Sequence, residues 1–304
     1  MIRNVFLGTS DFAAAVMRRL AGSRYRPGLA VTLPDRPRGR GRKPDPPPVA
    51  SAARELEIEL VQTGDVNDAD TLQRIRAARP DVVTLCAFGQ LIKQPLLSEY
   101  PLLNVHPSLL PRWRGAAPIE RAIMAGDAET GVSAMRVTAG FDEGPVALQQ
   151  RVAIGPDEDF GALSSRLAEL GGELLIRALE LHHAGELEFY EQDHALATYA
   201  EKITREERRL DPRQPAERLA ATVRALTPHI GTHLEFDGGE WLGVWKARAE
   251  GGELEPGTLV AGGGELRLGC GGGVLKLLVV QPPGGRRMRV EDYLRGHGVP
   301  ARAR

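Results

Sequence analysis

The chain has 304 residues, of which 42% are hydrophobic and 26% are charged, a composition typical of globular proteins. At this length it has room for two domains of ordinary size. No apolar run approaches the roughly 20 residues of a transmembrane helix, and the N-terminus lacks a signal peptide's apolar region and cleavage site. Cys86 and Cys270 are far apart and have no metal-ligand spacing. We therefore expect a cytoplasmic protein without membrane contact, disulfide framework or metal, in which both cysteines are buried as small apolar side chains.

A net charge of −1 argues against a protein that binds nucleic acid through its overall charge. The charge is uneven, however, because residues 35–43 carry five basic side chains against one acidic side chain. Taken alone, such an Arg/Gly/Pro run is most often a solvated surface arm. It can also attract phosphate locally although the whole molecule is nearly neutral.

The first half of the chain alternates short apolar runs with segments of helical periodicity. Strands are predicted at 5–8, 29–33, 58–61 and 81–88, and helices at 12–20, 49–56 and around 72–75. Ser10 or Asp11 can cap the first of these helices. A long helix with leucines from 163 to 181 follows. This alternation predicts a Rossmann-like α/β domain, a mostly parallel sheet with helices on both faces.

Ligands in such sheets bind beyond the carboxyl ends of the strands. Gly8-Thr9, Phe88-Gly89 and Asn104–His106 are expected to meet there. The first loop is not Gly-x-Gly-x-x-Gly, so the pattern does not indicate a dinucleotide cofactor.

The pattern changes beyond about residue 207. A helix is predicted at 217–226, and short strands broken by glycine are predicted at 232–236, 241–249, 258–260, 266–270 and 274–281. Five short strands with tight turns favour a small barrel of the oligonucleotide-binding (OB) type. We expect a first domain at 1–186, a linker at 187–206 and an OB-like domain at 207–304.

One stretch carries the chemistry. It reads Asn104-Val105-His106-Pro107-Ser108-Leu109-Leu110-Pro111, followed by Arg114-Gly115 and by Gly140-Phe141-Asp142-Glu143-Gly144. Asn104 and His106 share one face of an extended segment, and the glycine-bounded turn can return Asp142 to the same pocket. An amide, an imidazole and a carboxylate suit transfer of an acyl group to an amine, which is itself the nucleophile. Taken singly, His106 could be a core histidine and Asn104 or Asp142 a turn residue; their combination favours catalysis.

This stretch resembles the signature of the folate-dependent formyltransferases, Asn-x-His-x-Ser-Leu-Leu-Pro with a downstream Asp-x-Gly. Three further segments resemble the methionyl-tRNA formyltransferase family within that group. They are Gly8–Ala13, the basic loop Pro34–Pro37 with Gly39–Lys43, and Tyr199–Ile203. The resemblance covers nearly the whole chain, and the Ser-Leu-Leu-Pro-x-x-Arg-Gly run is specific.

The resemblance implies transfer of the formyl group of 10-formyltetrahydrofolate to the α-amino group of methionine on initiator tRNA. It implies that Asn104, His106 and Asp142 are catalytic. It places the folate against Ser108, Leu109, Leu110, Pro111, Phe88, Gly89, Gln90 and Leu91; core and turn roles are the less favoured alternative for these residues. It assigns tRNA contacts to Arg36, Arg38, Arg40, Arg42 and Lys43, and, with less specificity, to Lys246, Arg248, Arg286 and Arg287 of the second domain. A monomer is expected.

Other functions stay open at this point. One is another 10-formyltetrahydrofolate-dependent formyltransferase acting on an amino sugar or a ribonucleotide, or a hydrolase that deformylates the folate. Another is a tRNA-binding protein without catalysis, against which the intact Asn104, His106 and Asp142 argue. The second domain argues against the ribonucleotide enzyme, and the basic loop is the feature that separates a tRNA enzyme from an amino-sugar enzyme.

Overall fold

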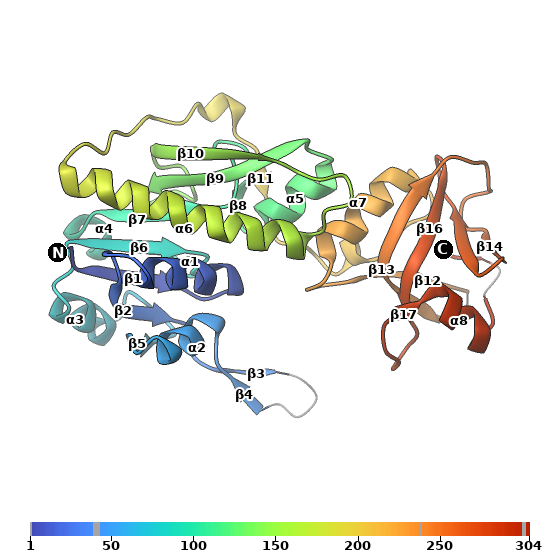
Figure 1. The fold of residues 1–304 in the computed structure, drawn as a ribbon, viewed down its shortest axis with the longest axis horizontal. Helices are drawn as coiled ribbons and strands as arrows, with labels where there is room; N and C mark the ends of the chain where they lie inside the picture. The colour runs from blue at the N-terminus through green and yellow to red at the C-terminus, as the bar shows by residue number, and fades with distance from the viewer. Residues whose placement is uncertain (1, 39–42, 238, 300–301) are drawn as a thin grey trace. The chain divides into compact units, whose positions relative to one another are not determined.

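The computed structural model describes residues 2–38, 43–237, 239–299 and 302–304. The chain forms two compact units (Figure 1). The first comprises Met1–Gly115, Thr130–Val152 and Ser164–Tyr199, and the second comprises Ala116–Glu129, Ala153–Leu163 and Ala200–Arg304. The second unit therefore takes two short segments from within the range expected for the first domain.

The first unit is built on a seven-stranded sheet in the order β10-β9-β7-β6-β1-β2-β5. Its strands are β1 (Asn4–Gly8), β2 (Pro27–Thr32), β5 (Glu59–Gln62), β6 (Val82–Cys86), β7 (Leu102–His106), β9 (Glu129–Arg136) and β10 (Val146–Ala153). The pairs from β5 to β7 are parallel, and β9 joins β7 antiparallel. The predicted mostly parallel sheet is confirmed, with β9 and β10 as an extension that was not predicted from the sequence.

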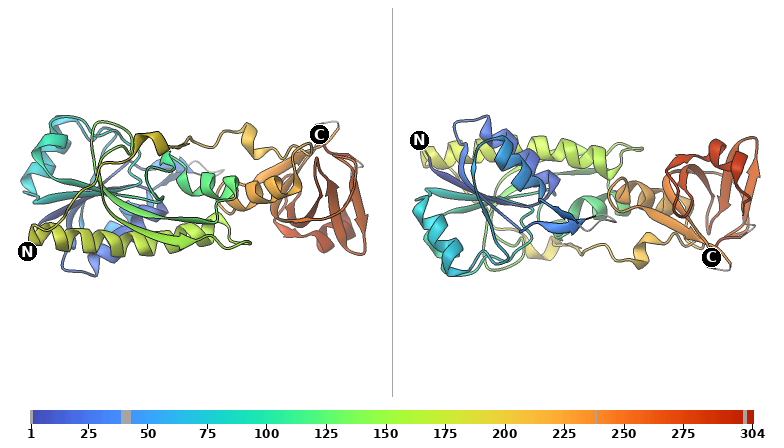
Figure 2. Two further views of the ribbon diagram at one scale, coloured as in Figure 1. Left: turned by 90° about the horizontal axis from the view of Figure 1, so that it is seen from above. Right: turned by 90° about the horizontal axis from the view of Figure 1, so that it is seen from below.

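The helices of this unit are α1 (Asp11–Ala21), α2 (Pro48–Glu55), α3 (Ala69–Ala77), the short α4 (Leu96–Glu99) and α6 (Phe160–Ala184), which begins in the second unit. Ser10 caps α1 by accepting a hydrogen bond from the Ala13 amide at 3.3 Å. On one face of the sheet, Leu72 and Ile75 of α3 belong to the same buried core cluster as Val5 of β1. On the other face α6 lies against β7, and only glycine fits at Gly171, because a Cβ there would come within 2.8 Å of a Val105 methyl carbon. Helices thus cover both faces, as predicted (Figure 2).

The described residues of the basic segment after β2 include two short strands where a loop was predicted. They form an antiparallel hairpin of β3 (Arg36–Arg38) and β4 (Lys43–Asp45). A second small pairing joins β8 (Arg114–Gly115) to β11 (Tyr199–Ala200). Arg40 and Arg42 lie outside the described residues.

The second unit holds an antiparallel sheet in the order β12-β13-β16-β15-β14, with β17 paired to β16. Its strands are β12 (Thr232–Glu235), β13 (Trp241–Glu250), β14 (Leu259–Gly262), β15 (Glu265–Gly269), β16 (Val274–Gln281) and β17 (Met288–Arg289). Its helices are α5 (Pro118–Ala125), α7 (Ala216–Leu226) and α8 (Val290–Gly296), and 3-10 turns occur at His194–Leu196 in the first unit and Glu206–Arg208 in the second. The five predicted strands are all present.

The C-terminal residues pair with both ends of this curled sheet. Ala303 bridges Phe236 at the end of β12, and Arg302 bridges Thr258 before β14. This antiparallel arrangement is compatible with an OB-like barrel, although over the described residues the sheet is not closed into one.

Both cysteines are buried and unpaired, as expected. Burial raises the pKa of the Cys270 thiol to about 11 and that of the Cys86 thiol further. Within the described ranges, none of the helices combines the length and the apolar character that crossing a membrane requires.

Candidate active site

The site lies at the carboxyl edge of the parallel strands. β7 carries Asn104 and His106, and Asn104 is paired in register with Leu85 of β6. The loops after β1 and β6 are tied together at this edge, since the Thr9 hydroxyl donates to the Phe88 carbonyl at 2.8 Å. The three segments expected at this edge therefore follow neighbouring strand ends.

His106 is held at both ring nitrogens, and its side chain is buried. Nε2 lies 2.8 Å from the carbonyl oxygen of Trp113. Because a carbonyl can only accept, Nε2 carries a hydrogen. Nδ1 lies 3.5 Å from Oδ2 of Asp142. The ring is thus fixed between a main-chain acceptor and a carboxylate.

Asp142 completes the predicted trio. Its Oδ2 accepts from the Gly115 amide at 3.0 Å, and its Oδ1 lies 3.4 Å from Nδ2 of Asn104. The amide of Asn104, Nδ1 of His106 and the Gly115 N–H therefore converge on one carboxylate. The Asn104 contact is at the long end of hydrogen-bond distances, so that amide is not locked in place.

A buried arginine and a glutamine hold the Asp142 loop, and neither was assigned a role from the sequence. The Arg114 side chain is 1% exposed and donates from Nε and Nη2 to Oε1 of Gln192 at 3.0 and 2.8 Å. Gln192 in turn donates from Nε2 to the carbonyl oxygens of Asp142 and Gly144 at 2.8 and 2.7 Å. The Arg114-Gly115 motif pointed toward the first of these residues, whereas Gln192 lies in the range expected to be a linker and gave no signal.

The segment after His106 is fixed from β9, which pairs His106 with Ser133. The Ser133 hydroxyl donates to the Ser108 carbonyl at 2.6 Å and accepts from the Leu110 amide at 3.2 Å. Ser108 itself donates to the Arg112 carbonyl at 2.6 Å. Both Ser108 and Leu110 are buried, so their side chains shape this loop from the inside, while Leu109 and Pro111 remain partly exposed.

The second segment predicted to bind folate, residues 88–91, also contains both buried and exposed residues. Phe88 is buried in the core beneath α3, and Gln90 is bonded to the main chain of Val66 and Thr63. Gly89 has φ +80° and open space around it, and Leu91 is 42% exposed. Exposed main chain beside exposed apolar surface suits a flat heterocycle with polar edges.

Three residues other than glycine adopt left-handed backbone conformations in the loops at this edge. Ala87, Trp113 and Asp142 have φ values of 42°, 63° and 51°. Such conformations are unfavourable for L-residues and tend to cluster at functional sites. Two of these residues carry the groups that face His106, namely the Trp113 carbonyl and the Asp142 carboxylate.

The basic residues of the hairpin are only partly described. Arg36 is exposed and lines a cavity of about 280 Å³ at the base of the hairpin, together with Thr9, Ser10 and Asp11. Arg38 and Lys43 belong to the paired backbone. The cavity joins the foot of the hairpin to the loop after β1.

The four basic candidates of the second unit are exposed but differ in their partners. Arg248 bonds Asp157 at 3.1 Å, and Arg287 donates to the Pro228 carbonyl at 3.1 Å. Lys246 lies on β13, and Arg286 follows β16. The described contacts do not gather the four into one cluster.

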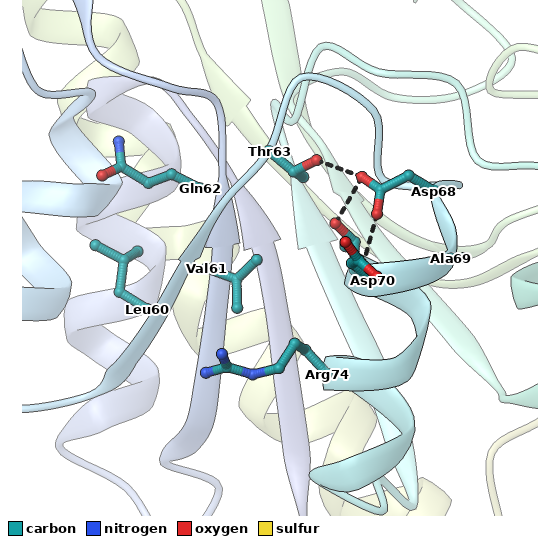
Figure 3. Close-up of a pocket in the computed structure, with 9 residues that line it drawn as sticks. Leu60, Val61, Gln62, Thr63, Asp68, Ala69, Asp70 and Arg74 are labelled. Carbon is teal, nitrogen blue, oxygen red and sulfur yellow. Dashed lines mark hydrogen bonds between the residues drawn. The ribbon is translucent and has the colours of Figure 1, made fainter.

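A larger cavity, of about 560 Å³, lies between β5 and the start of α3 (Figure 3). Asp68 at its rim accepts from the Thr63 hydroxyl at 2.8 Å and from the Thr71 amide at 2.7 Å. Hydrogen bonds from the Thr71 amide and from the threonine hydroxyls lower the pKa of Asp68. This carboxylate caps α3, so the arrangement is explained by helix capping and is separate from the trio.

Comparison with known proteins finds matches over nearly the whole chain. The family model described as formyl transferase matches residues 2–179, and that described as the formyl transferase C-terminal domain matches residues 202–298. The methionyl-tRNA formyltransferase of Methylobacillus flagellatus is 40% identical over 96% of this chain and 96% of its own length. That of Rubrobacter xylanophilus is 43% identical over 98% of each chain.

Among solved structures, HypX from Aquifex aeolicus in complex with tetrahydrofolic acid is similar in fold. It has a TM-score of 0.65 at 18% identity and covers 96% of this chain and 47% of its own.

Proposed function

Since the chain belongs to the formyl transferase family, with methionyl-tRNA formyltransferases matching nearly its whole length, we propose that it formylates initiator methionyl-tRNA. The donor is 10-formyltetrahydrofolate and the acceptor is the α-amino group of the esterified methionine. The observation that carries this function is the convergence of Asn104, His106 and Asp142 at one strand edge. The product serves translation initiation.

The reaction needs an oxyanion site and a route for one proton. The amine nitrogen forms a bond to the formyl carbon, and the bond from that carbon to N10 of the folate breaks. The unlocked amide of Asn104 and Nδ1 of His106, with the ring protonated at both nitrogens, donate to the oxygen on which negative charge develops. The proton lost by the amine balances the proton gained by N10.

In this scheme the Asp142 carboxylate orients His106. The carboxylate continues to accept hydrogen bonds while the amine attacks the formyl carbon. Its carboxylate is held by the Gly115 amide, and its main chain is held by Gln192. Donors fixed before the reaction need no reorganisation as charge develops. The chemistry assigned to these groups requires no metal.

The folate is proposed to lie along Leu109 and Pro111 on one side and Gly89 and Leu91 on the other. Ser108, Leu110, Phe88 and Gln90 support those surfaces from inside, because their side chains are buried or bonded to main chain. This division refines the candidate folate site into contact and supporting residues.

The tRNA is proposed to contact the basic hairpin through Arg36, Arg38, Arg40, Arg42 and Lys43, and the second unit through Lys246, Arg248, Arg286 and Arg287. Guanidinium groups bind phosphate through bidentate hydrogen bonds. The enzyme is proposed to act in the cytoplasm as a monomer, with domains at 1–186 and 207–304 joined by 187–206.

A transfer assay tests the function directly. Purified protein, 10-formyltetrahydrofolate and methionylated initiator tRNA should give formylmethionyl-tRNA, whereas methionylated elongator tRNA should react much more slowly. His106→Ala protein is the matched blank. Absence of formylmethionyl-tRNA with the wild-type protein would reject the proposal, and formylation of an amino sugar instead would establish the main alternative.

A further inference from the structure

The outer face of β13 combines aromatic and basic side chains. Leu242 and Val244 belong to the core of the second unit, whereas Trp241 is 41% exposed. The pairing with β16 shifts register around Lys246. A shift of this kind turns a side chain that would point inward to the outside, and Trp245 and Lys246 both lie at least partly exposed.

A cavity of about 380 Å³ opens on this face. Gly243 provides a floor without a side chain. His233 of β12 and Gln281 of β16 are its partners across the two neighbouring strands, and Trp241 and Trp245 flank it along its own strand. Two indole rings therefore border the cavity along β13, and two polar side chains border it on the neighbouring strands.

One indole is held rigidly. Nε1 of Trp245 donates to Oε1 of Gln281 at 2.8 Å, and the Arg287 guanidinium lies 3.2 Å from the ring centroid. On the ring's edge, a Cβ at Gly231 would collide with Trp245, so a glycine is required there. Trp245 is therefore a preorganised wall.

The other indole is available. Within the described residues, the ring contact of Trp241 is an edge-on approach of His233 at 6.3 Å between centroids. A planar ligand above Gly243 can stack on this exposed indole. His233 then offers a ring nitrogen beside it.

The charged side chains differ between the cavity and the surface next to it. Glu235 is paired with Trp241 across the strands, and its carboxylate lies 3.6 Å from Arg209 and 3.5 Å from His233. A carboxylate at this position disfavours phosphate inside the cavity. The basic residue that lines the cavity, Arg208, donates to the carbonyls of Gly231 and Ile230. Lys246 lies outside the cavity and is exposed next to Trp245 on β13, where it favours phosphate.

We propose that this cavity binds an unpaired nucleobase of the tRNA, stacked on Trp241, while the adjoining phosphate lies toward Lys246. The proposal rests on the proposed function and names a contact of its second unit. Proteins bind single-stranded nucleotides through an aromatic platform beside a basic track, and the cavity volume lies in the range of small-ligand pockets.

Binding of unacylated initiator tRNA, measured by filter retention over a series of salt concentrations, tests the proposal. Trp241→Ala should raise Kd about 5- to 150-fold, the loss expected for one stacked base. The slope of log affinity against log salt should stay unchanged, because every phosphate-binding side chain is still present. Trp241→Phe should retain most of the affinity. Lys246→Ala should instead flatten the slope by about 0.7 to 0.9.

Val260→Ala is the matched control, since Val260 is an equally exposed apolar residue of the same unit, at 42%; it should bind as wild type. Trp241→Leu keeps apolar bulk without a stacking face and serves if the alanine variant does not fold. Wild-type affinity for Trp241→Leu, or a loss of affinity accompanied by a flatter slope, would overturn the proposal. Failure of the proposed function is a separate result, seen as absence of formyl transfer by the wild-type protein.

Discussion

Two substitutions of Gln192 distinguish its role in positioning Asp142 from its contribution to the free energy of unfolding. The Gln192 side chain is 7% exposed and makes four hydrogen bonds, two from the Arg114 guanidinium and two to the carbonyls of Asp142 and Gly144. Gln192→Leu removes all four. Arg114 Nη1 keeps Nδ1 of His194 at 3.3 Å and Glu143 at 3.9 Å, but its Nε and Nη2 lose their acceptor, which costs about 1–3 kcal/mol for a buried donor and more for a charged one.

Gln192→Glu makes the finer test. The carboxylate still accepts from Arg114, so most of the unfolding free energy should be retained. Its second oxygen, however, would face the carbonyl oxygens of Asp142 and Gly144, where the amide donated. The loop should move away, and a displacement of about 1 Å in a catalytic group can cost about 10²-fold in rate.

The measurements are urea unfolding of each variant and single-turnover formyl transfer to methionyl-tRNA. Gln150→Leu is the matched control, because Gln150 is exposed on β10 and should change neither quantity. We expect Gln192→Leu to lose both stability and rate. We expect Gln192→Glu to lose mainly rate, in the single-turnover rate at saturation more than in the concentration that gives half of that rate. Wild-type turnover by Gln192→Glu would show that the two carbonyl contacts do not position Asp142.

Three further predictions concern the trio and the basic hairpin. Asn104→Ala and His106→Ala should each lower single-turnover transfer by about 10²–10³ while tRNA affinity stays near wild type; unchanged rates would remove the residue from the mechanism. Asp142→Asn should lower turnover with little change in tRNA affinity, because the anion facing His106 is lost; full activity would reduce Asp142 to a turn residue. Replacing both Arg40 and Arg42 by Ala should weaken methionyl-tRNA binding and flatten the salt slope by about 0.7–0.9 for each phosphate that the variant no longer neutralises; an unaltered slope would favour a small-molecule acceptor.

The sequence predicted the central strands because they are continuous apolar runs, as strands buried on both faces must be. β6 (Val82–Cys86) is buried at every position. β10 (Val146–Ala153) instead has mostly exposed or half-exposed residues, so hydrophobic periodicity gave no signal for it. The same reason explains the hairpin of Arg36–Asp45, whose pairing depends on main chain rather than on an apolar face.

In the candidate site, too, some residues could be predicted from the sequence and others could not. Asn104 and His106 were predictable because two polar residues at alternate positions of a buried strand must share a face. Their partners were not, because the Trp113 contact uses a carbonyl whose direction depends on the backbone path. Gln192 lies 78 residues from Arg114, and neither spacing nor composition links such a pair.

One short segment, residues 192–198, holds the partners of both ring nitrogens of His106. Thr198 accepts from the Trp113 amide through its hydroxyl and from the Arg114 amide through its carbonyl, each at 2.9 Å. Six residues earlier, Gln192 fixes the loop of Asp142. The Trp113 carbonyl and the Asp142 carboxylate are therefore positioned from the same stretch of chain. A shift of this stretch would move both partners of the imidazole together, whereas a change in either loop would move only one of them. Activity should therefore depend on residues 192–198, although none of them touches the reacting atoms.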